Sequence, residues 1–186
     1  MRSRFVVVGA AALLALTACN DRGTDKDAVV ALPPVELVEQ PAASAGGACI
    51  LWDYALIKQK IGIAFSVAAS DQVGTTSTCV VQTVAGDWPD LALSVVESTA
   101  ADAKVFNSDL KPAKAVGVNG LGKAGYRLNS PAAGTHGPIV EIVWLSEAKQ
   151  LQTLRYTFAK TAKAADVTAM NAKLLSLAKA MDSTAG

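Results

Sequence analysis

Two strand-like segments in the second half of the chain constrain its fold more than any other feature. Residues 139–145 and 151–158 alternate apolar and other side chains, as strands with one buried face do. The connection between them, 146–150, is short and polar, so we expect the two strands to pair antiparallel. The residues that share one face are Val140, Ile142 and Trp144 in the first strand and Leu154, Tyr156 and Phe158 in the second.

The C-terminal segment predicts the clearest helix of the chain, with Asp166 as its expected N-cap. Its apolar residues recur at spacings of three and four and form one stripe: Val167, Met170, Leu174, Leu177 and Met181. Helices that bind a membrane surface or a partner also carry such a stripe, but packing on a core is its commoner use. A helix laid across an antiparallel sheet predicts an α+β layer.

The rest of this region supplies further strands and a short helix. The helix is expected from Asp53, its N-cap, through Ile61, with Gly62 ending it. We expect strands at 78–84 and 91–97, joined by a hairpin-like turn, a helical or irregular excursion at 98–114, and strands at 116–119 and 125–129. The predicted fold class is α+β, an antiparallel β-sheet with N-terminal and C-terminal helices packed against it.

The N-terminus has the features of a secretory signal that ends at a cysteine. Arg2 and Arg4 precede an apolar run, 5–16, that is shorter than the about 20 residues a membrane-spanning helix needs. The next residues resemble the bacterial lipoprotein box, Leu16-Thr17-Ala18-Cys19. The resemblance implies cleavage before Cys19 and a diacylglycerol on its thiol, and two acyl chains give a stable anchor. The implied partner is the membrane, and the implied location is the extracytoplasmic face of the cell membrane.

This interpretation divides the chain into a lipoprotein signal peptide (1–18), the lipidated cysteine with a flexible tether (19–47), and a single α+β domain (48–186). The tether is expected to be flexible because mixed charges, prolines and small residues bury little apolar surface. Loss of the two arginines with the signal changes the net charge from +1 to −1. A near-neutral exported protein is not expected to bind nucleic acid.

The two remaining cysteines, Cys49 and Cys79, form an even pair in an oxidising compartment, where a disulfide is the favoured interpretation. Two buried free thiols and a metal pair are the alternatives. A metal site needs more ligands, and the chain has a single histidine, His136, so we expect no metal.

The glycine run 120–125 matches the G-x-G-x-x-G pattern of dinucleotide sites, with Glu141 about 20 residues further on. That chemistry requires a helix after the glycines, so that phosphate meets the helix N-terminus, but residues 126–128 continue as a strand. We therefore expect a tight turn and no cofactor. His136 lies in a polar loop with no nucleophile as its partner, so a solvated histidine is expected and no catalytic residue is assigned.

Three residues are the candidates for contact with a ligand or partner. Trp88 precedes Pro89 in a turn, where an aromatic side chain is expected to be exposed. Arg127 and Arg155 lie on predicted strands and are suited to an anionic group. Trp144 shares an apolar strand face and is expected in the core, while Asp87 and Asp90 are expected to be surface charges.

The whole pattern resembles a family of small actinobacterial lipoproteins built on a domain of unknown function. Its features are a lipobox, a Pro/Ser/Thr-rich tether, a cysteine that opens a short helix ending in Gly, a second cysteine and a Gly-Leu-Gly loop. They match Cys49 to Gly62, Cys79 and 120–125 of this chain. The resemblance implies a sheet with helices packed against it, similar to the PsbP-type α/β/α sandwich, and brings no established activity.

These observations favour a lipid-anchored extracytoplasmic module that is not an enzyme and that binds an envelope protein or has a structural role in the envelope. The alternative is a carrier that holds a small apolar or lipid ligand between the sheet and the closing helix. An enzyme of unrecognised type ranks third. A large apolar pocket between sheet and helix favours the carrier, and a filled core with one exposed patch favours the interaction module.

Overall fold

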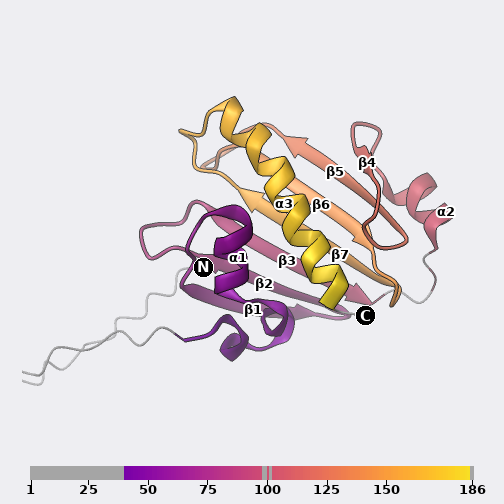
Figure 1. Cartoon of the computed structure of the whole chain (residues 1–186), viewed down its shortest axis with the longest axis horizontal. Helices are drawn as coiled ribbons and strands as arrows, with labels where there is room; N and C mark the ends of the chain where they lie inside the picture. Colours follow the sequence, from indigo (N-terminus) through magenta and orange to yellow (C-terminus); the bar gives the residue numbers. More distant parts are fainter. Residues whose placement is uncertain (1–39, 98–99, 101, 185–186) are drawn as a thin grey trace, which may run out of the picture. The chain divides into compact units, whose positions relative to one another are not determined.

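The computed structural model describes residues 40–97, 100 and 102–184. The predicted signal peptide, Cys19 and most of the predicted tether lie outside these residues. Figure 1 shows the elements, which follow one another in this order: η1 (Ala42–Ala45), η2 (Gly47–Leu51), α1 (Tyr54–Ile61), β1 (Val67–Val73), β2 (Thr76–Gln82), β3 (Asp90–Glu97), α2 (Ala103–Val105), η3 (Phe106–Leu110), β4 (Val116–Val118), β5 (Ala124–Ser130), β6 (Ile139–Leu145), β7 (Gln150–Thr157) and α3 (Ala164–Thr184).

The strands form one seven-stranded sheet in the order β1-β2-β3-β7-β6-β5-β4, and every neighbouring pair is antiparallel. The predicted pairing of β6 with β7 is confirmed, with Ile142 opposite Leu154. Their turn places Lys149 at φ 63°, the left-handed residue that commonly follows a type I turn in a three-residue hairpin loop. Pairing of β2 with β3 confirms the other predicted hairpin.

Strand β1 was not predicted. It is an edge strand of the sheet, and six of its seven residues are exposed, so no apolar alternation marks it in the sequence. Gly74, at φ 57°, makes the tight turn that joins it to β2, with Val73 opposite Thr76.

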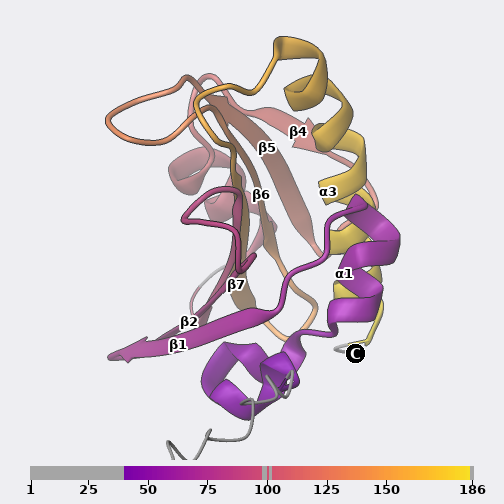
Figure 2. The ribbon, with the colours of Figure 1, turned by 90° about the vertical axis from the view of Figure 1, so that its left-hand side faces the viewer.

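Helices α1 and α3 lie on the same side of the sheet, as Figure 2 shows from the edge. The core between them and the strands contains the predicted strand face and helix stripe, with Trp144, Leu154 and Leu174 each 0% exposed. Burying such side chains contributes roughly 1.5–3 kcal/mol each. The predicted α+β class, with N-terminal and C-terminal helices on an antiparallel sheet, is confirmed.

The start of α3 differs from the prediction. The helix begins at Ala164, three residues before Val167, the first helical residue expected from an Asp166 N-cap. Asp166 lies in the first turn, and its carboxylate accepts a hydrogen bond from the Lys163 backbone N–H at 3.1 Å. A third-position acid that reaches back in this way is half of a capping box, so Asp166 still stabilises the N-terminus of the helix.

The opposite face of the sheet is covered over one part by the segment that contains α2 and η3. Phe106 of this segment is fully buried and packs with Tyr126, Val143 and Leu145, which point away from α3. The Phe106 and Tyr126 rings lie 5.6 Å apart. A second, smaller core therefore covers β5 and β6 on this face.

The folded region begins earlier than residue 48, the predicted domain start. Ala42, in η1, is 1% exposed and belongs to the main core. Ser70 on β1 donates a hydrogen bond to the Ala45 carbonyl, and Ala48 N–H donates to Ser77 Oγ at 2.8 Å. The predicted boundary was wrong because this alanine-rich stretch packs through small side chains, which the composition of a tether also contains.

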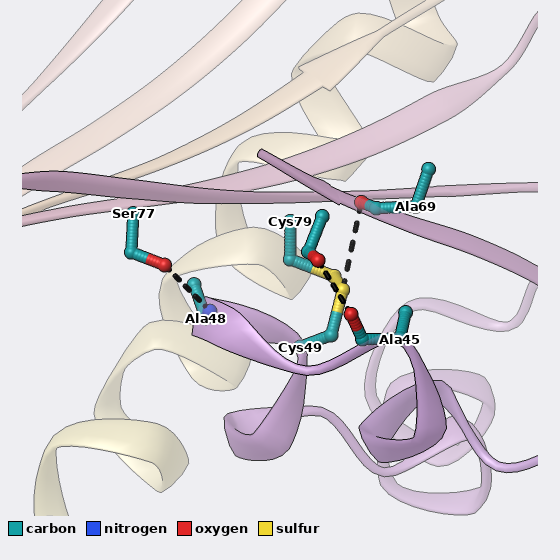
Figure 3. Close-up of a disulfide and its surroundings, with 7 residues drawn as sticks. Ala45, Ala48, Cys49, Ala69, Ser77 and Cys79 are labelled. Atoms are coloured by element: carbon teal, nitrogen blue, oxygen red, sulfur yellow. Dashed lines mark hydrogen bonds between the residues drawn. A yellow bond between two sulfur atoms is a disulfide. The ribbon is translucent and has the colours of Figure 1, made fainter. Parts of the chain in front are cut away.

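The cysteine pair forms a disulfide, Cys49–Cys79, with Cα atoms 4.9 Å apart (Figure 3). It joins η2 to the middle of β2, and both cysteines are 0% exposed. Closure of a loop with a sequence separation of 30 residues stabilises the fold by about 3–4 kcal/mol in the chain-entropy model.

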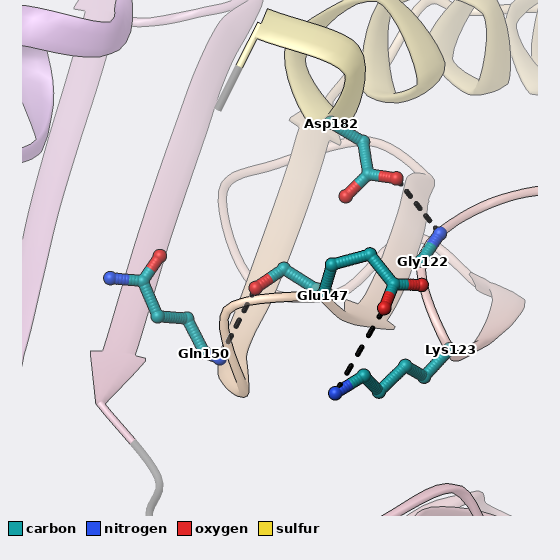
Figure 4. A network of polar contacts seen from close by, with 6 residues as sticks. Gly122, Lys123, Glu147, Gln150 and Asp182 are labelled. Carbon is teal, nitrogen blue, oxygen red and sulfur yellow. Dashed lines mark hydrogen bonds and ion pairs between the residues drawn. The ribbon is translucent and has the colours of Figure 1, made fainter. Parts of the chain in front are cut away.

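The glycine run is a structural turn, and a strand (β5) follows it. Gly122 has φ 51°, and a Cβ built there would lie 2.2 Å from the Leu145 carbonyl oxygen. Leu121 beside it is buried in the main core. Figure 4 shows how Asp182, near the end of α3, holds this loop: its carboxylate accepts a hydrogen bond from Gly122 N–H at 2.9 Å. The other carboxylate oxygen accepts from Trp144 Nε1–H at 3.1 Å.

This geometry predicts different costs at two glycines of the same loop. Gly120, at φ 69°, has only the Lys179 amine within 4 Å of a built Cβ. We expect Gly120→Ala to lower the free energy of unfolding by about 1–2 kcal/mol through backbone strain. Gly122→Ala adds the clash with Leu145, about 1–3 kcal/mol more. Urea denaturation of both variants checks this, and equal losses would contradict the close packing of Gly122.

Candidate functional site

The structure brings two of the three predicted contact residues to one region and leaves the third elsewhere. Arg155 lies on β7 opposite Ala92 and Glu141, on the sheet face that points away from α3. Trp88 lies two residues before Asp90, the first residue of β3, and Asp90 is on the same face as Arg155. Arg127 lies opposite Ile142 of the main core, so it is on the helix-covered face.

Arg155 is exposed, and it makes no hydrogen bond or salt bridge to the residues that the structure describes. Its cross-strand neighbour Glu141 is half-buried. Burial raises the pKa of Glu141 above its ordinary value, and the Arg155 charge offsets part of that rise. Burial raises the pKa of Tyr126 on the neighbouring strand β5, and the Glu141 charge raises it further.

Asp90 is the second carboxylate near Arg155, and the expectation of a surface charge was wrong for it. The residue is half-buried, and its Oδ1 atom is buried without a hydrogen-bond partner among the described residues. Burial raises the pKa of Asp90, whereas hydrogen bonding to Thr157 and the charges of Arg155 and His136 lower it. Asp90 lies opposite Thr157 on β7, which makes it a diagonal neighbour of Arg155.

His136 and Trp88 form the rim of this region. Their rings meet edge to face, with centroids 5.8 Å apart, and both side chains are half-buried. His136 Nδ1 lies 2.6 Å from the Gly137 carbonyl oxygen. The loop is held against β7 because Gly137 N–H donates to the Phe158 carbonyl at 2.7 Å. The solvated loop histidine expected from the sequence is therefore a partly buried residue in contact with a tryptophan.

We call this set of residues the Arg155 patch: Trp88, Asp90, His136, Glu141 and Arg155. It combines an unpaired guanidinium, an unpaired carboxylate oxygen and an aromatic edge on an uncovered part of the sheet. These groups can donate to and accept from a bound molecule. Across the described residues, no group of three His, Cys, Asp or Glu side chains is arranged to hold a metal ion.

Asp90, His136 and Glu141 were not predicted as members of the patch, although the sequence contains a signal for Glu141. The predicted hairpin turn ends at Ser146 and Gln150, and Glu141 and Arg155 each lie five residues from those ends. Counting back from the turn therefore pairs the two charges. For Asp90 and His136 no such count exists, because their contact depends on the packing of separate loops.

Apart from the Arg155 patch, the glycine loop lines a pocket of about 230 Å³, which Asn107 also lines. Its lining is mostly loop backbone, and the one charged residue there, Lys123, is within 3.9 Å of the exposed Glu147. An exposed pair of this kind contributes little to stability. This pocket offers less varied chemistry than the Arg155 patch.

No protein-family model matches the chain, and no curated protein matches it. Among the described residues, no helix is both long enough and apolar enough to cross a membrane.

The raised pKa of Glu141 predicts a pH-dependent stability. A folded-state carboxyl pKa above the unfolded value of about 4.3 means that stability falls as pH rises through the folded pKa. Glu141→Gln removes the buried charge, so we expect the variant to be more stable than wild type at pH 7, with the difference shrinking toward pH 4. Urea denaturation across this range measures it.

Glu147→Gln is the matched control, because Glu147 has a side chain 73% exposed. We expect that variant to stay within about 0.5 kcal/mol of wild type throughout. A Glu141→Gln variant that is less stable than wild type at pH 7 would contradict the desolvation of Glu141.

Proposed function

We propose that this protein is a lipid-anchored, extracytoplasmic binding or structural module of the bacterial cell envelope and that it acts without catalysis. The Arg155 patch is the surface proposed to contact an envelope protein. One observation carries the choice of contact surface: Arg155 is exposed, has no hydrogen bond or salt bridge among the described residues, and lies between two half-buried carboxylates.

The chemistry of the patch supports a protein as the partner. Arg and Trp are enriched among the residues that dominate the affinity of protein interfaces. A polypeptide presents both donors and acceptors, which suit the unpaired Asp90 oxygen and the Arg155 guanidinium. Once desolvated by a partner, each such hydrogen bond to a charged group is worth about 1.5–3 kcal/mol.

The surroundings of the patch support the same function. On the helix side, buried side chains form a continuous core from β2 to β6. The uncovered face beside the patch has small and β-branched side chains, and Thr78 and Ser94 bond to each other through their hydroxyls at 3.0 Å. An open face of small side chains suits contact with another protein more than enclosure of a substrate.

A photocrosslinker placed on each side of the sheet tests the contact surface in the anchored protein. We expect a benzoylphenylalanine at Ser94, on the uncovered face, to crosslink one discrete partner in source cells, and one at the exposed Ser176 on α3 to yield none. Arg155→Ala should reduce the Ser94 crosslink about tenfold or more, as loss of a dominant interface arginine costs about 2 kcal/mol.

Arg127→Ala is the control, because it removes a strand arginine from the opposite face. The crosslink should persist in that variant. Equal crosslinking from Ser94 and Ser176, or no effect of Arg155→Ala, would refute the Arg155 patch as the contact surface.

The anchor is tested separately. If Cys19 carries the lipid, Cys19→Ser removes both acyl chains, and the protein should move from the membrane fraction to the soluble or unprocessed fraction. Cell fractionation with an immunoblot measures this, and Cys49→Ser with Cys79→Ser is the control that leaves Cys19 in place. An unchanged membrane fraction for Cys19→Ser would contradict lipid anchoring.

A further inference from the structure

A pocket of about 280 Å³ lies between the sheet and the N-terminal half of α3, on the side of the sheet away from the Arg155 patch. Its apolar walls come from three elements: Tyr156 and Phe158 at the end of β7, Met170 on α3, and Ile61 and Ile63 around the end of α1. The Tyr156 and Phe158 rings meet edge to face, 4.6 Å apart. An apolar chain entering here replaces water on surfaces that favour such contact.

Two charged residues of α3, Asp166 and Lys173, also line the pocket, and they lie about two helical turns apart. Asp166 is engaged by the Lys163 backbone N–H. Lys173 is exposed and makes one long hydrogen bond, from Nζ to the Ile61 carbonyl at 3.3 Å. An ammonium has three donors, so two of them remain for an anionic group. The pocket therefore has apolar walls, with the Lys173 ammonium at one end and the Asp166 carboxylate about two helical turns away.

We propose that this pocket binds a single-chain amphiphile with one anionic head, the chain lying against Tyr156, Phe158 and Met170 and the head on Lys173. The size supports one chain, because the pocket, at about 280 Å³, is just below the roughly 300–1,000 Å³ range of ligand sites. A carboxylate and a phosphate monoester share the required chemistry. This site is separate from the proposed protein contact and does not depend on it.

Calorimetry with four ligands of equal chain length tests the proposal on residues 20–186, which include every described residue. Octanoate and octyl phosphate should bind, whereas octanol and octylamine should bind about tenfold or more weakly, because they cannot accept a charge-assisted hydrogen bond as an anion does. The better of the two anions identifies a fatty acid or a phosphate-bearing lipid as the source.

Variants on the exposed surface of α3 locate the site. Ala169 lines the pocket and is exposed, so Ala169→Phe should fill it and abolish binding. Ala172→Phe is the matched control, since Ala172 is equally an exposed alanine of α3 but lies outside this pocket. Lys173→Met should weaken octanoate binding about tenfold, and Lys173→Arg should retain most of it.

Binding of an anion that is lost in Ala169→Phe, kept in Ala172→Phe and weakened in Lys173→Met supports the proposal. No binding of either anion, equal binding of octylamine, or binding unchanged in Ala169→Phe overturns it. Thermal unfolding of each variant without ligand shows that the fold is retained, since both alanines are on the helix surface.

Discussion

The two hydrogen bonds to Asp182 connect the parts of this fold that the sequence leaves far apart. A carboxylate near the C-terminus of a helix is unfavourable for the helix dipole, so its presence needs a compensating interaction. Here Trp144 and Gly122 supply it, from the central sheet and from the glycine loop. The indole N–H of the largest core residue is satisfied in the same contact. Helix α3 is thereby fixed to the sheet at its C-terminal end, where the apolar stripe alone would permit sliding.

The contrast between the two ends of α3 explains where space remains on the helix side. At the C-terminal end, Asp182 joins helix, loop and strand. Nearer the N-terminal end, the helix packs through apolar side chains and is bonded to the end of α1 through Lys173, and the pocket lies there. The disulfide contributes a similar constraint to the N-terminal layer, about 3–4 kcal/mol, and holds η2 against β2. Helix α1 follows directly after η2, so one wall of the pocket depends on that bridge.

Periodicity and turn length were sufficient to predict the central hairpin, the buried stripe of α3 and the α+β class, because each depends on residues close in sequence. The edge strand β1 and the start of the folded region could not be predicted in the same way. An exposed strand of Ala, Ser, Asp and Gln has no apolar alternation, and an alanine such as Ala42 looks the same in a tether as in a core. The strand β1 and the packing of Ala42 both depend on contacts with residues that are distant in the sequence.

The candidate site was predictable to the extent that strand register determines it. Arg155 and Glu141 follow from the hairpin, whereas the contact of His136 with Trp88 depends on two loops that only the folded sheet brings together. Gly137 allows this approach: a Cβ there would lie 2.1 Å from the Ala159 carbonyl oxygen, so any other residue would push the His136 loop away from β7. The rim of the Arg155 patch therefore depends on a glycine whose role is visible only in three dimensions.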